Sequence, residues 1–98
     1  EIDNGVSGRA AQKLALKLRE MSAGRQVIVV THLAQIAALG KNHYQIEKHT
    51  DGQRTFTEIR LLDGKDRVEE VARIMGGIQI TDSTLKTAEE MLAQADVL

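Results

Sequence analysis

The 98-residue chain contains no cysteine, no proline and no tryptophan, and it has one phenylalanine and one tyrosine. Without cysteine there can be no disulfide framework and no thiolate metal site, which suits a reducing compartment. The scarcity of aromatic side chains predicts an aliphatic core. A chain of this length forms one domain, or a piece of one, with a core of modest size.

Strong charge of either sign and long apolar runs are also missing. The net charge is −1, which gives no argument for nucleic-acid binding, and no stretch approaches the roughly 20 apolar residues of a membrane span. Neither Gly-x-x-x-x-Gly-Lys-Ser/Thr nor Gly-x-Gly-x-x-Gly occurs, so the chain has no phosphate-binding loop of its own. We therefore do not expect it to hydrolyse a nucleotide unaided.

One stretch organises what is present. Residues 27–30 are four consecutive β-branched residues, a composition typical of a parallel strand buried on both faces. Open α/β sheets bind their ligands at the carboxyl ends of such strands. Thr31 and His32 follow directly, and a helical pattern begins at Leu33. The sequence therefore predicts an α/β fold with a ligand-binding position at His32.

The remaining pattern predicts an order of loop, helix, strand, helix, two strands and two helices. The apolar stripes and turn signals place helices near 9–21, 33–39, 68–75 and 82–95, and strands at 43–49 and 54–62 joined by an Asp-Gly turn. Ser7 and either Thr81 or Asp82 are expected to cap helices. Three basic residues of the first helix are expected to face solvent: Lys13, Lys17 and Arg19.

Few side chains could support chemistry. Glu1 and Asp3 could hold a metal or polarise a water, or they could be solvated loop acids. An imidazole at the position of His32 could donate a hydrogen bond to a phosphate, although a lone histidine is equally often an ordinary surface or core residue. The three histidines do not have the spacing of zinc ligands, so we predict no metal site among them.

Three stretches together resemble a known family. The segment Glu1-Ile-Asp-Asn-Gly-Val-Ser-Gly-Arg-Ala-Ala resembles the end of a Walker B motif running into a D-loop. Residues 27–37, Val-Ile-Val-Val-Thr-His-Leu-Ala-Gln-Ile-Ala, resemble the switch strand and histidine loop of ABC-type ATPases. The amino-acid sequences of both stretches, together with residues 67–77 and 80–82, resemble the RecN family of bacterial DNA-repair proteins, which are relatives of the SMC proteins. The resemblance covers nearly the whole chain.

The resemblance implies that residues 1–98 are the C-terminal portion of an ABC/SMC-type P-loop ATPase head, with a parallel strand, flanking helices, a β-hairpin and two C-terminal helices. It implies ATP and Mg²⁺ as cofactors. Glu1 would orient or deprotonate the attacking water, and His32 would contact the γ-phosphate. The D-loop, which reaches across to a second head, would be formed by Asp3, Asn4, Gly5, Val6 and Ser7. This loop departs from the Ser-Ala-Leu-Asp form of ABC transporters.

The implied partners are a second head in a homodimer, the missing N-terminal half of the same head, and DNA through the parent protein, in the bacterial cytoplasm at the nucleoid. The abrupt start at Glu1 and the unpartnered strand also lead us to expect a piece of a longer protein. Two alternatives stay open. The chain could belong to another SMC-like or ABC ATPase head, or it could be a non-catalytic α/β interaction module.

Overall fold

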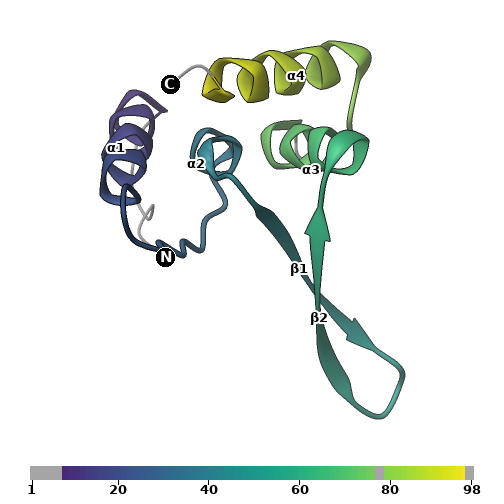
Figure 1. Cartoon of the computed structure of the whole chain (residues 1–98). Helices are drawn as coiled ribbons and strands as arrows, with labels where there is room; N and C mark the ends of the chain where they lie inside the picture. Colours follow the sequence, from purple (N-terminus) through teal and green to yellow (C-terminus); the bar gives the residue numbers. More distant parts are fainter. Residues whose placement is uncertain (1–7, 77–78, 97–98) are drawn as a thin grey trace.

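A computed structural model describes residues 8–76 and 79–96 of the chain. Within these residues, four helices lie together, and a two-stranded antiparallel hairpin projects from them (Figure 1). The elements in chain order are α1 (Gly8–Met21), α2 (Ala34–Leu39), β1 (His43–Thr50), β2 (Thr55–Leu62), α3 (Gly64–Gly76) and α4 (Asp82–Asp96). The mixture of helices and strands agrees with the predicted α/β class at that coarse level.

The short helix α2 lies at the centre of the helical part and packs against α1, α3 and α4. Its buried residues are Ala34, Ile36 and Ala38. The surrounding helices present mainly small aliphatic side chains, among them Val71 of α3 and Ala88 of α4, both fully buried. Small side chains let helices approach closely while they keep the packing dense. The predicted aliphatic core is confirmed.

The predicted helices and caps agree with the structure where the structure describes them. The amphipathic patterns at 68–75 and 82–95 correspond to α3 and α4. Of the two proposed caps of α4, Thr81 supplies the bond, since its Oγ1 accepts a hydrogen bond from the backbone N–H of Thr84 at 3.1 Å. The other predicted cap, Ser7, lies outside the described residues.

The hairpin forms where the Asp-Gly signal predicts it. Asp51 Oδ1 accepts hydrogen bonds from the backbone N–H groups of Gln53 and Arg54 at the turn, and Gly52 has a φ of +92°, which favours glycine. Two apolar cross-strand pairs, Tyr44–Leu61 and Ile46–Ile59, occupy one face. All four side chains on that face are more than half exposed.

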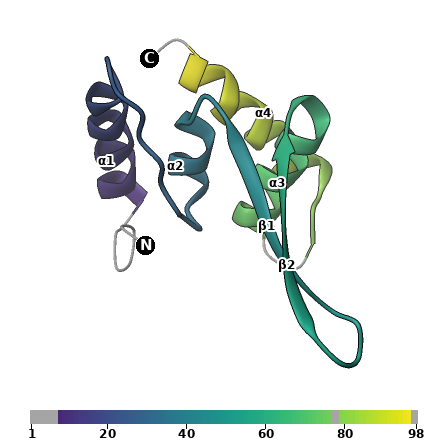
Figure 2. The same ribbon diagram turned by 60° about the horizontal axis from the view of Figure 1, so that its bottom comes forward.

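The predicted parallel strand at residues 27–30 is absent from the structure. The segment is extended but belongs to no sheet, and the sheet in the described part of the chain is the antiparallel β1–β2 pair. Val27 and Val29 are half-buried, whereas Ile28 is 83% exposed and Val30 is 56% exposed. The prediction of burial on both faces is wrong for this chain taken alone, because a strand needs hydrogen-bonded neighbours. Figure 2 shows the segment as a plain trace running past α1 to α2.

Candidate functional site

The structure places one of the predicted catalytic residues. Glu1 and the predicted D-loop lie outside the described residues, so the structure does not test their roles. The untested D-loop positions are Asp3, Asn4, Gly5, Val6 and Ser7. Helix α1 begins at Gly8, the residue that follows this segment.

His32 is exposed and lies at the end of the extended segment, with Leu33 between it and α2. The side chain of Thr31 shapes this junction, because its Oγ1 accepts a hydrogen bond from the backbone N–H of Leu33 at 3.0 Å. Leu33 is itself extended, with φ −102° and ψ 126°, and its carbonyl accepts the first helical bond, from Ala37. The helix predicted to follow His32 is therefore present, whereas the strand predicted to precede it is not formed among the described residues.

Two arginines from other helices bind the far end of α2. Arg67 of α3 donates from Nη2 to the carbonyls of Ala37 at 3.1 Å and Ala38 at 3.2 Å, and to that of Gly40. Arg19 of α1 donates from Nη1 to the carbonyl of Leu39 at 3.3 Å. The carbonyls of residues 37–39 lie in the last turn of α2 and that of Gly40 follows it directly, so no helical N–H is available to them.

Arg19 also joins α2 to the last helix. Its Nη1 donates to the carbonyl of Ala95 at 3.0 Å, so one guanidinium bonds the carboxyl ends of both α2 and α4. The sequence-based assignment of Arg19 to a solvated face is wrong in this respect, since the residue is half-buried and bonded. An arginine in the last turn of a helix gives no sign of which other helix it will reach.

A second polar cluster joins β1 to α3. Glu70 is 6% exposed, and its carboxylate accepts a hydrogen bond from Gln45 and several from Arg73. The hydrogen bonds that the Arg73 side chain donates to Glu70 raise the pKa of Arg73. Burial, reinforced by the positive charge of Arg67, lowers the pKa of His43 at the start of β1. This cluster stabilises the junction between the hairpin and the helices.

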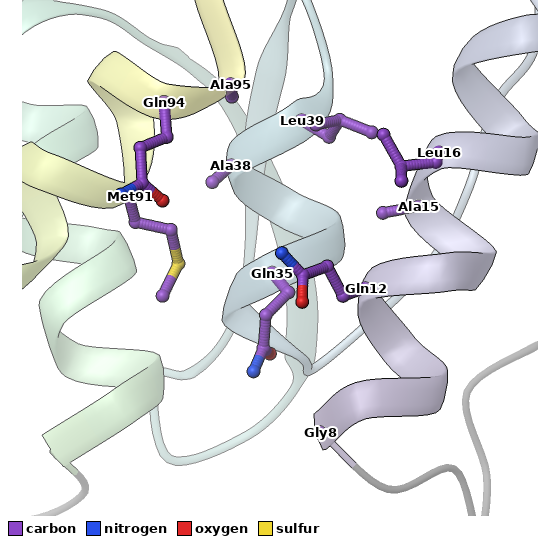
Figure 3. A pocket seen from close by; sticks show the side chains of 10 residues that line it. All are labelled: Gly8, Gln12, Ala15, Leu16, Gln35, Ala38, Leu39, Met91, Gln94 and Ala95. Atoms are coloured by element: carbon purple, nitrogen blue, oxygen red, sulfur yellow. The ribbon is translucent and has the colours of Figure 1, made fainter. Parts of the chain in front are cut away.

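A groove of about 170 Å³ lies between α1, α2 and α4, and Figure 3 shows the side chains that line it. Its walls are aliphatic, and its polar groups are the amides of three glutamines. Among the described residues that line it, none has a titratable or nucleophilic side chain. The lining residues are Gly8, Gln12, Ala15, Leu16, Gln35, Ala38, Leu39, Met91, Gln94 and Ala95.

Over 8–76 and 79–96, no three or more His, Asp or Glu side chains are placed to hold a metal ion. Within those same ranges, no helix combines the length and apolar character that crossing a membrane requires.

Comparison with known proteins gives consistent relatives, although no protein-family model matches the chain. The chain is 45% identical over 92 residues to the DNA repair protein RecN of Halalkalibacterium halodurans, covering 94% of the chain. It is 43% identical over 96 residues to that of Bacillus subtilis, covering 98% of the chain, and 45% identical over 93 residues to that of Deinococcus radiodurans, covering 95%. The chain spans 16%, 17% and 16% of the lengths of these relatives, respectively. Over nearly its whole length, this chain therefore matches a segment of the DNA repair protein RecN.

Proposed function

We propose that this chain forms the C-terminal part of an ATP-binding and ATP-hydrolysing head of a RecN-like protein that acts in DNA double-strand break repair and recombination. The observation that carries the proposal is an aliphatic segment that pairs with no strand among the described residues and is followed by an exposed histidine just before helix α2. The match to RecN supports the repair role, since the relatives carry that name.

The remainder of the head would complete a sheet around residues 27–30. Among the described residues, none offers this segment a strand partner, and the chain is a small share of its relatives' length. Ile28 and Val30 are more than half exposed, and burying such a side chain fully stabilises by about 1.5–3 kcal/mol. The remainder of the head would also cover the exposed hairpin face that carries Tyr44 and Leu61. Neighbouring strands on both sides would turn the segment into the buried strand that its composition predicts.

Within such a head, the chain's own residues would act at the γ-phosphate of ATP. Glu1 would orient or deprotonate the attacking water, and the imidazole of His32 would donate a hydrogen bond to a γ-phosphate oxygen. Residues 3–7 would reach the second head, so that ATP lies between two heads. Alignment of the water and stabilisation of charge are the main demands of phosphoryl transfer. The phosphate-binding loop and most Mg²⁺ ligands would come from the rest of the head, and the chain alone would be inactive.

DNA would be contacted by other parts of the protein. The net charge of the chain is −1, and sequence-independent DNA binding needs a basic surface. A RecN-like protein of this kind would work in the cytoplasm, at the bacterial nucleoid.

The test uses the full-length protein and measures ATP binding separately from hydrolysis. Glu1→Gln keeps the size of the side chain but removes its basicity, so ATP binding should persist while hydrolysis slows by about 10²-fold or more. His32→Ala should also lower turnover. His49→Ala, on the exposed hairpin, is the matched control and should hydrolyse ATP like the wild type. Wild-type turnover in both the Glu1 and His32 variants would refute the proposed site.

A further inference from the structure

His32 is held in place by a helix that is too short to be stable alone. Helix α2 has six residues, which is less than two turns, and isolated helices of that length are unstable in water. Leu33 alone separates the helix from His32. Because the chain between them is so short, any movement or fraying of α2 displaces the backbone that carries the imidazole.

The carboxyl end of α2 depends on side chains from elsewhere for its hydrogen bonds. Arg67 donates to two of its carbonyls and to that of Gly40, the residue that follows the helix, and Arg19 donates to the carbonyl of Leu39. Both donors are cations at the negative end of the helix dipole, so their charge adds to the hydrogen bonds. Both are also half-buried, which limits competition from water. The helices α1 and α3, which are distant from α2 in sequence, thus fix the carboxyl end of α2, while His32 lies just before its amino end.

We propose that Arg67 and Arg19 are positioning residues for ATP hydrolysis, which fix α2 and thereby place the imidazole of His32 against the γ-phosphate. This inference rests on the proposed function of His32. In this role neither arginine would need to touch the nucleotide, because each would act through the carbonyl groups at the end of α2. A displacement of about 1 Å in a catalytic group can lower a rate by roughly 10²-fold, so the loss of these bonds should appear in turnover.

The bonding of Arg67 suggests a conservative variant. A single nitrogen, Nη2, makes all three hydrogen bonds to the end of α2 with its two N–H groups, so at least one N–H is shared between carbonyls. A lysine ammonium is also a single nitrogen, and it has three donors. In the full-length protein, Arg67→Lys should retain most of the turnover. Arg67→Met keeps an unbranched stem but has no donor, and we expect it to lower kcat about 10-fold while the KM for ATP stays near that of the wild type. Arg19→Met should act in the same direction, and less, because Arg19 makes one bond to α2.

A double-variant cycle distinguishes a role of Arg67 in positioning His32 from a role in supporting the fold. Single-turnover hydrolysis is measured with excess enzyme for the wild type, Arg67→Met, His32→Ala and the combination of the two. If Arg67 acts through His32, Arg67→Met causes no further loss in the His32→Ala background. Arg54→Met, at the exposed hairpin turn, is the control and should be neutral in both backgrounds.

Three outcomes would overturn the inference. An equal loss from Arg67→Met in both backgrounds would mean that the arginine only supports the fold. Wild-type turnover in Arg67→Met and Arg19→Met, together with a slow His32→Ala, would mean that α2 needs neither arginine, and the proposed function would survive. Wild-type turnover in His32→Ala would refute the proposed function itself.

Discussion

Removal of Arg73 should destabilise the chain by leaving a buried charge without its cation. The carboxylate of Glu70 is 6% exposed, and Arg73 Nε donates to its two oxygens at 3.0 and 3.1 Å. Breaking a fully buried pair by removing one partner costs about 3–5 kcal/mol. The Arg73 side chain is 58% exposed, so water already screens part of the attraction. We expect Arg73→Met to lower the free energy of unfolding by about 2 kcal/mol.

A second substitution tests whether the buried charge is the cause. Replacing Glu70 by glutamine as well removes the charge but leaves an amide that can hydrogen-bond to Gln45 of β1. The double variant Arg73→Met/Glu70→Gln should therefore be more stable than Arg73→Met alone, and within about 1 kcal/mol of the wild type. Urea unfolding followed by circular dichroism measures all three proteins at pH 7. A double variant that is less stable than Arg73→Met would refute the reasoning.

Three further predictions concern single residues. Burial and the charge of Arg67 lower the pKa of His43 below its ordinary value of 6.5. As the pH falls, His43 is therefore protonated in the unfolded chain before it is protonated in the folded one. The free energy of unfolding should accordingly decrease as the pH drops below 6.5. In urea titrations, His43→Gln should lose part of this pH dependence, and identical pH profiles would contradict the assignment. Gly52→Ala, at a φ of +92°, should cost about 1 kcal/mol through backbone strain, and an unchanged melting temperature would argue against that strain. Val71 is fully buried, so Val71→Ala should lower the unfolding free energy by about 2 kcal/mol, and a neutral result would show that the core refills the space.

The elements that sequence predicted well are those with local causes. The helices at α3 and α4 follow from apolar residues that recur with the helical period, and the β1–β2 turn follows from the conformations open to Asp51 and Gly52. These causes act over a few residues, so they can be recognised in any window of the chain.

The features that sequence could not predict depend on distant partners. The aliphatic composition of residues 27–30 indicates a buried strand, but a strand also needs neighbours, and no described residue supplies one. Arg19 and Arg67 bond to backbone carbonyls 20 to 76 positions away. Backbone carbonyls are present at every residue, so nothing in the sequence marks which ones an arginine will reach. The roles of Glu1 and of residues 3–7 stay predictions.

The central proposal is that residues 27–30 form an interior strand of a larger ATPase head, with His32 at its carboxyl end. Amide hydrogen exchange at Ile28 and Val30 tests this most directly when it is measured in the 98-residue chain and in the full-length protein. We predict fast exchange in the chain alone, since no described residue offers these amides a strand partner. In the full-length protein we predict exchange that is roughly a thousandfold slower, which corresponds to about 4 kcal/mol of opening free energy. Equally fast exchange in both proteins would contradict the claim.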